Sequence, residues 1–158
     1  MLSRFTILAA ASALLSLASA APTVAAGEKL RGVTDPIFHL YLQVGEDGTS
    51  VVVAAEATAG EFTITESVQE TTSGKYLNVQ EADTSFKPLA FGAQENFSGW
   101  GLEGDTLITT DASEYGRQLN FLACETETAD VYQMYLQTGG DMPEGSCTSQ
   151  TLHLPCLC

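Results

Sequence analysis

Apolar and polar residues alternate in short runs along this 158-residue chain. The runs at residues 38–44 and 119–123 each place apolar side chains at every second position. Alternation with a period of two is typical of half-buried β-strands. Gly, Asp or Ser separates the runs, and no run beyond residue 20 has the periodicity of a helix. The pattern predicts an all-β, single-domain antiparallel sandwich or barrel of roughly eight to ten short strands.

The segment at residues 97–124 is the centre of this pattern, because it holds two alternating strands, a polar hairpin and the only tryptophan. Trp100 stands between Gly99 and Gly101, and Leu102 shares its strand face. A tryptophan between glycines is typical of a core residue against which backbone packs closely. We therefore expect Trp100 to be buried. The alternative is an exposed Trp100 on which a sugar ring stacks.

The N-terminal residues have the features of a secretory signal peptide. Residues 1–20 combine a short basic start, an apolar stretch and a final Ala-Ser-Ala cleavage site. The apolar stretch is too short to span a bilayer. Residues 21–35 are small and polar and predict a flexible lead-in, and residues 36–158 are expected to form the single β domain. The sequence thus predicts a secreted protein, located outside the cell or in a cell wall.

The charge is strongly negative, with six basic residues against twenty acidic ones and a net charge of −14. Such a surface repels the phosphates of nucleic acids and anionic lipids. We therefore expect neither a nucleic-acid nor a membrane partner, and a monomer whose acidic residues keep a small domain in solution.

All four cysteines lie in the C-terminal part of the chain, at Cys124, Cys147, Cys156 and Cys158. A Cys124–Cys147 bridge would leave Cys156 and Cys158 to close a small, strained ring. In the alternative, the last two cysteines pair with Cys124 and Cys147 and attach the C-terminal strand to the body. We favour this second pairing, because two bridges that fix a tail stabilise more than one that closes a tiny loop. Either way, the fold is stapled at its C-terminal end.

Two carboxylates and two histidines are the only candidates for catalysis. Glu103 and Asp105 lie two apart on one predicted strand, where a glycosidase pair is conceivable, but Gly104-Asp105 is also an ordinary turn. His39 and His153 lack the G-x-S-x-G elbow that would present a nucleophilic serine. We therefore predict no catalytic residue and no enzyme.

Metal and cofactor sites are not predicted either. The acidic turns at residues 45–48 and 140–141 lack the oxygen spacing of a calcium loop. Cys156-x-Cys158 with His153 is a poor match to a zinc site in an oxidising compartment.

One modification site is predicted. Asn96-Phe97-Ser98 is an N-x-S sequon in a predicted loop of a secreted chain, so Asn96 is a glycosylation candidate.

Beyond these local patterns, the order of several elements between about residues 62 and 147 carries a family resemblance. The elements are Tyr76-Leu77 after a Ser-Gly turn, Gly99-Trp100-Gly101-Leu102, the segment 119–124, an aromatic strand at 131–136, and Cys147. This order resembles that of small secreted fungal cell-wall proteins of the phialide-associated (PhiA-like) type, some of which are described as IgE-binding allergens. The resemblance implies a wall-associated fungal protein without established enzymatic activity.

Three functions are compatible with these patterns. The first is a non-catalytic secreted protein of the fungal cell wall, with allergen or elicitor behaviour towards a host. The second is a carbohydrate-binding module for wall polysaccharide, in which Trp100 would stack on a sugar. The third is a small hydrolase, which needs a cleft and a carboxylate of raised pKa. We expect the first, with wall polysaccharide or a host protein as the partner.

Overall fold

The computed structural model describes residues 27–155, and these form an all-β structure with one short 3-10 helix. The all-β prediction is confirmed, although the described strands outnumber the prediction because several have only two or three residues. The elements are β1 (Arg31–Gly32), β2 (Tyr41–Val44), β3 (Val51–Ala54), η1 (Glu56–Thr58), β4 (Phe62–Ile64), β5 (Val68–Glu70), β6 (Tyr76–Val79), β7 (Phe86–Gly92), β8 (Trp100–Glu103), β9 (Thr106–Thr109), β10 (Phe121–Glu125), β11 (Tyr132–Gln137), β12 (Cys147–Gln150) and β13 (Leu152–His153).

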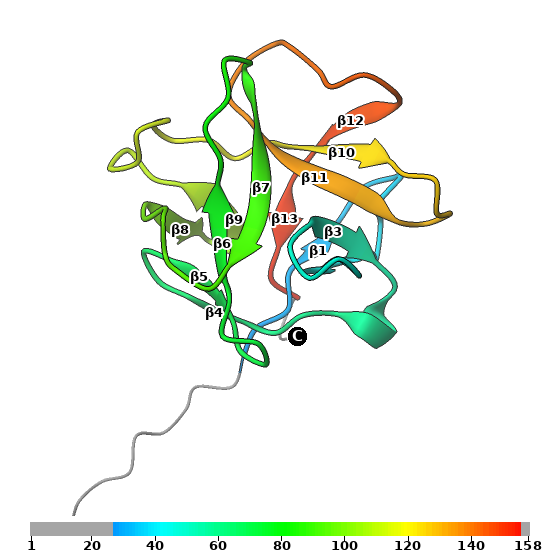
Figure 1. Ribbon diagram of the computed structural model, residues 1–158, viewed down its shortest axis with the longest axis horizontal. Coiled ribbons are helices and arrows are strands. Elements are labelled where there is room, and N and C mark those ends of the chain that lie inside the picture. The colour runs from blue at the N-terminus through cyan, green and yellow to red at the C-terminus, as the bar shows by residue number, and fades with distance from the viewer. Residues whose placement is uncertain (1–26, 156–158) are drawn as a thin grey trace, which may run out of the picture.

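The strands form one antiparallel sheet that curls around the core (Figure 1). Its order is β4-β5-β6-β7-β11-β3-β2-β1-β13-β9-β8, and β10 pairs with both β11 and β12 beside this path. Strand β11 connects the two parts of the sheet. One of its edges pairs with β10 along residues 132–136, and the other is divided between β3 and β7.

The two ends of this strand order come together, so that the sheet is a nearly closed antiparallel barrel. The backbone amides of Gly99 and Trp100 donate hydrogen bonds to the carbonyl oxygen of Glu66, at 2.8 and 3.0 Å. Glu66 lies in the turn between β4 and β5, whereas Trp100 begins β8. These two bonds therefore join the first and last strands of the order.

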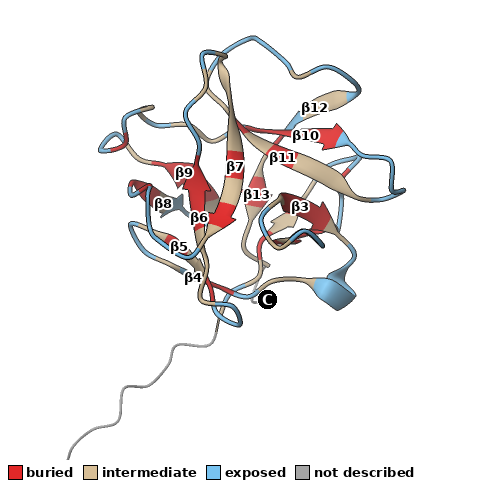
Figure 2. Cartoon of the chain, in the orientation of Figure 1, coloured by how far each residue is buried: buried red, intermediate tan, exposed pale blue. Residues whose placement is uncertain are grey.

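Trp100 lies in the core, as its glycine neighbours predict. Its side chain is 1% exposed, and its indole Nε1–H donates to the carbonyl oxygen of Leu77 in β6 at 3.0 Å. Phe121 stacks parallel to the indole, with ring centroids 6.3 Å apart, and Phe97 meets it edge-on at 5.1 Å. Buried residues mark the inward faces of the strands, and exposed residues mark most of the loops (Figure 2).

Leu102 does not share this burial. It is 40% exposed, although alternation puts it on the same strand face as the buried Trp100. Strand β8 is the last strand of the order, and the chain turns at Gly104 two residues beyond Leu102.

The expected lead-in at residues 21–35 contributes to the sheet in the part that the structure describes. Glu28 forms a bridge with Phe62, and β1 pairs with both β2 and β13. Leu30 is fully buried, and its carbonyl oxygen accepts a hydrogen bond from the amide of Leu42 at 2.8 Å. The flexible lead-in is therefore wrong for residues 27–35, while residues 1–26, with the predicted signal peptide, lie outside the described part.

A disulfide joins Cys124 of β10 to Cys147 of β12. The two residues are directly opposite each other in the sheet, with Cα atoms 4.0 Å apart. The pairing of Cys124 and Cys147 with the last two cysteines, which we favoured from the sequence, is therefore wrong. Cys156 and Cys158 themselves lie outside the described residues. The expected staple near the C-terminal end is confirmed.

Between Gly27 and Pro155, no helix is both long and apolar enough to cross a membrane.

We expect replacement of Gly99 by alanine to destabilise the fold more than replacement of Gly104. Both glycines have positive φ, 117° and 64°, but a Cβ at Gly99 would lie 2.7 Å from the Cβ of Ser113, whereas one at Gly104 meets nothing within 4 Å. The expected loss of unfolding free energy is about 3 kcal/mol for Gly99→Ala and about 1 kcal/mol for Gly104→Ala. Urea denaturation measures both, and equal losses would contradict the close packing at Gly99.

Candidate functional site

Three side chains from neighbouring strands lie side by side on one face of the sheet. Gln43 in β2 is opposite Val52 in β3, and Val52 is opposite Gln133 in β11. Residues directly opposite each other in adjacent strands share a face. The same register continues from Gln133 to Cys124 and from Cys124 to Cys147, so the disulfide is on this face as well.

The surface around the Gln43–Val52–Gln133 row is hollowed into a groove with a volume of about 520 Å³. We call it the amide groove. Its aliphatic lining comes mainly from Val52, Ala54 and Val131. Its polar lining includes the two amides and the hydroxyl-bearing residues Thr58 and Thr128. A mostly apolar hollow with a few polar groups is the usual form of a ligand site.

Gln43 occupies a special position in this lining because it is a buried amide. Its side chain is only 7% exposed, and its Nε2 donates to the carbonyl oxygen of Tyr41 at 3.3 Å. Within residues 27–155, no group donates a hydrogen bond to its Oε1. The Oε1 atom itself is open to solvent, because Arg31 Nε is the one buried side-chain nitrogen or oxygen without a partner among the described residues. A ligand in the groove would therefore find a free acceptor at Gln43.

Two smaller hollows continue the amide groove. One, of about 290 Å³, shares Gln43 and Thr58 with it and extends to Glu70 and Ser73. The other, of about 360 Å³, shares Thr128 and Val131 and is lined by residues 125–132. Together the three hollows suit an extended ligand better than a compact one.

The turn at residues 45–50 forms one wall, and Asp47 organises it. Asp47 Oδ1 accepts hydrogen bonds from the backbone amides of Thr49 and Ser50, at 2.8 and 2.7 Å, and Oδ2 accepts one from the Ser50 hydroxyl. These bonds, that of the Ser50 side chain first, hold the pKa of Asp47 well below its ordinary value. Lys75 bonds the carbonyl oxygen of Gly48 and so attaches this turn to the start of β6.

Glu70 organises the turn beside the second hollow in the same way. Burial alone would raise its pKa, because the side chain is only 6% exposed. Hydrogen bonds from Ser73 and Thr72 outweigh this effect and lower the pKa. The backbone amides of the two residues donate to the carboxylate at 2.6 and 3.1 Å.

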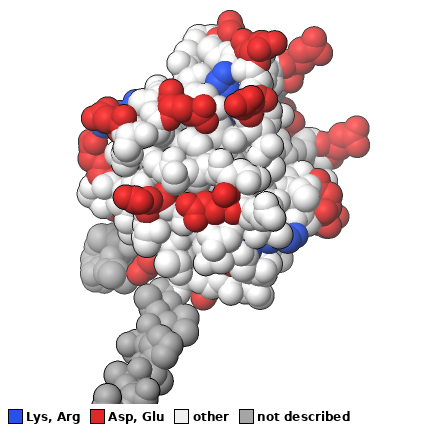
Figure 3. Space-filling model, turned by 60° about the vertical axis from the view of Figure 1, so that its left-hand side comes forward, with Lys and Arg blue, Asp and Glu red and all other residues white. Residues whose placement is uncertain are grey.

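The three hollows are negatively charged along their length. Their lining includes Glu46 and Asp47 at the amide groove, Glu70 at the second hollow, and Glu125, Glu127 and Asp130 at the third. Their described lining contains no Lys, Arg or His. Among the charged side chains on the face of the molecule drawn in Figure 3, most are acidic.

Trp100 cannot serve as the sugar-stacking platform, because neighbouring rings cover it and leave only 1% of the side chain exposed. The alternative in which an exposed Trp100 stacks on a sugar ring is therefore wrong. Among the large hydrophobic side chains of the described residues, the exposed ring is that of Phe38, which is 55% exposed and packs edge-on against His39.

Asn96 lies in an exposed loop, where its sequon is held by a residue that sequence reasoning missed. Asn78 is 1% exposed, and its Oδ1 accepts hydrogen bonds from the amides of Asn96 and Phe97, at 2.8 and 3.1 Å. Its Nδ2 donates to the carbonyl oxygens of Tyr76 and Gln94. Asn78 lies between the apolar residues Leu77 and Val79 in β6. A polar residue at such a position is the sequence signal that could have indicated this role.

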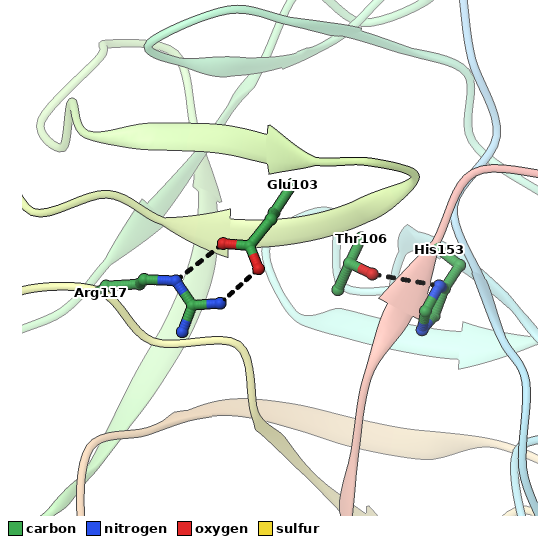
Figure 4. Close-up of polar contacts among 4 residues, drawn as sticks. All are labelled: Glu103, Thr106, Arg117 and His153. Atoms are coloured by element: carbon green, nitrogen blue, oxygen red, sulfur yellow. Dashed lines mark hydrogen bonds and ion pairs between the residues drawn. The ribbon is translucent and has the colours of Figure 1, made fainter.

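The other carboxylate candidates, Glu103 and Asp105, are each paired with a basic residue, and Figure 4 shows the pair of Glu103 with Arg117. Arg117 makes two hydrogen bonds to Glu103, at 2.8 and 2.6 Å, and is the main reason that the pKa of Glu103 is lowered. His153 lies 3.3 Å from Asp105 and is the main reason that the pKa of Asp105 is lowered. A glycosidase acid needs a raised pKa, so this pairing does not suit acid catalysis.

His153 also contacts two threonine hydroxyls. Its Nδ1 lies 3.3 Å from Thr106 Oγ1, and its Nε2 lies 2.8 Å from Thr151 Oγ1. The order hydroxyl, imidazole, carboxylate resembles a nucleophilic triad. None of the three hollows described above is lined by these residues, however. The contact of His153 with Thr106 instead joins β13 to β9. We interpret this cluster as a polar tie between strands.

No three His, Cys, Asp or Glu residues between positions 27 and 155 are grouped closely enough to hold a metal ion. The turn at residues 45–48 belongs instead to the wall of the amide groove, where Asp47 bonds backbone.

Comparison with known proteins adds no relative: no family model, no curated protein and no solved structure matches the chain.

We expect Glu70→Gln to destabilise the protein in a pH-dependent manner. The folded pKa of Glu70 is below the ordinary value of 4.5, so its charge stabilises the fold above that pH and this contribution is lost as the pH falls through the lowered pKa. At neutral pH the loss in unfolding free energy should be about 1–2 kcal/mol, and it should shrink in acid. Denaturation at several pH values measures it, with the exposed Glu95→Gln as control. A loss that stays constant with pH would contradict this role.

Proposed function

We propose that the mature protein is a non-catalytic, secreted fungal protein associated with the cell wall, where its exposure to a host makes it an allergen or elicitor. The observation that carries this proposal is the disulfide between Cys124 and Cys147 in an all-β body. Disulfides persist in oxidising compartments outside the cytosol. The predicted signal peptide at residues 1–20 and the fungal wall-protein resemblance support the same location.

The state of the carboxylates supports a non-catalytic role. Among the described residues, four carboxylates have a pKa displaced by their surroundings, and in all four, Asp47, Glu70, Glu103 and Asp105, the pKa is lowered. Each is held by hydrogen-bond donors and remains ionised at neutral pH. General acids in hydrolases are tuned in the opposite direction.

A second candidate function, a carbohydrate-binding module for wall polysaccharide, is favoured by the amide groove. Amide and hydroxyl groups of Gln43, Gln133, Thr58 and Thr128 suit the hydroxyls of a sugar chain. The two functions are compatible, since binding to polysaccharide is one way for a secreted protein to stay in the wall.

Secretion and wall attachment are tested by expressing the full chain in a filamentous fungus and separating medium, wall and cytosol. We expect the protein in the wall and the medium, beginning at Ala21 after cleavage. A cytosolic protein that retains residues 1–20 would contradict the proposal. Reactivity with IgE from sensitised sera, or a defence response in plant tissue, then tests the part that concerns a host.

We expect the secreted protein to carry an N-linked glycan at Asn96, because this residue is exposed and the buried Asn78 fixes the backbone of its loop. Digestion with an N-glycosidase should lower the mass of the wild type. Asn96→Gln and Ser98→Ala should each give the lower mass directly. A wild type whose mass does not change on digestion would show that the sequon is unused.

A further inference from the structure

We propose that the amide groove binds a polyhydroxylated chain that carries amino groups, namely a partly N-deacetylated amino-sugar polymer. This inference rests on the second candidate function above and names the class of polysaccharide.

The hydrogen-bonding groups of the groove suit the neutral part of such a chain. Gln43 and Gln133 flank Val52, so their strands are two inter-strand spacings, about 10 Å, apart. The buried Gln43 leaves its Oε1 free of partners within the described residues, and Gln133 makes only a 3.5 Å contact to a carbonyl oxygen. Both amides can therefore bond the hydroxyls of neighbouring sugar rings, with the aliphatic ring faces over Val52.

The charge of the groove suits the amino groups. Glu46 and Asp47 lie at the amide groove itself, and the two adjoining hollows add Glu70, Glu125, Glu127 and Asp130. No basic residue in the described lining opposes them. Such a surface attracts ammonium groups and repels phosphate or uronate groups. The acidic residues alone would not select a sugar over another cation. The free amide oxygen of Gln43 is the feature that favours a ligand with hydroxyl groups.

A basic peptide meets the same charge requirement but fits the groove less well. One common way for an extended peptide to bind is to add a strand to a free sheet edge. Strand β3 crosses the middle of the groove and is paired with β2 on one side and β11 on the other. A peptide backbone would therefore find no edge here, whereas a sugar chain needs none.

The disulfide holds the supporting strands in place. It joins β10 to β12 in the same row as Gln133, and β10 pairs with β11 along its length. A binding face built on paired strands keeps its amides at fixed spacing before the ligand arrives.

The test measures binding of the mature, oxidised protein to four soluble or suspended probes: partly deacetylated chitin, fully acetylated chitin, β-glucan and polylysine. We expect the deacetylated polymer to bind most tightly, with an affinity that falls as salt is added. Gln133→Ala should weaken this binding about tenfold. Glu46→Gln should weaken it about threefold and reduce the salt dependence.

Matched controls keep these results interpretable. Gln137→Ala removes an amide from the same strand outside the groove, and Glu95→Gln removes an exposed acid elsewhere. Both should bind like the wild type. Gln43→Met, with its thermal midpoint measured in parallel, removes the buried amide with little change in side-chain length.

Each contrary outcome has a distinct meaning. Equal binding of acetylated and deacetylated chitin would overturn the amino-group requirement and leave the carbohydrate-binding function intact. Binding of polylysine as tight as that of the sugar, and insensitive to Gln133→Ala, would overturn the sugar in favour of general attraction of cations. Absence of binding to every probe would overturn both the inference and the carbohydrate-binding function, whereas the fractionation experiment tests wall location independently.

Discussion

The structure depends on the closure of the sheet at Trp100. One carbonyl oxygen, that of Glu66, accepts the amides of Gly99 and Trp100 and so joins the two ends of the strand order. The indole then reaches across the core to bond Leu77 and stack on Phe121. A curled sheet with its ends apart would leave this aromatic cluster in water, and burial of large rings is the main source of stability in a small domain. Closure gives the sheet an inner face that lines the core and an outer face that carries the amide groove.

Strand β11 connects the closed sheet to the groove on its outer face. Its divided edge brings β3 and β7 to one side, while its other edge pairs with β10 and thereby connects to the disulfide. The amide groove lies where β11 meets β3 and β2. Carboxylates shape the walls of this groove and of the hollow beside it, since Asp47 and Glu70 each accept hydrogen bonds from backbone amides of their own turns. The acidic composition, which as a whole favours solubility, thus also has local structural roles.

Local patterns along the chain predict which segments are strands but not how the strands pair. Alternation and flanking glycines were enough to predict the all-β fold and a buried Trp100. The register of strand pairing depends on contacts between residues distant in sequence, and it determines the features that local patterns do not predict. It places Cys124 opposite Cys147, brings Gln43 and Gln133 to one groove, and inserts β1 between β2 and β13. Leu102 shows the limit of alternation itself, because a face that is buried at one end of a strand is exposed at the other.

Amide hydrogen exchange measured residue by residue tests the closure at Trp100 most directly. If the sheet closes there, the amides of Gly99 and Trp100 and the indole N–H are expected to exchange only through global unfolding, as slowly as amides of the central strands β10 and β11. Fast exchange at these three groups, with slow exchange in β10 and β11, would mean that the sheet opens at Trp100 while the remainder stays folded, and would contradict the closed sheet.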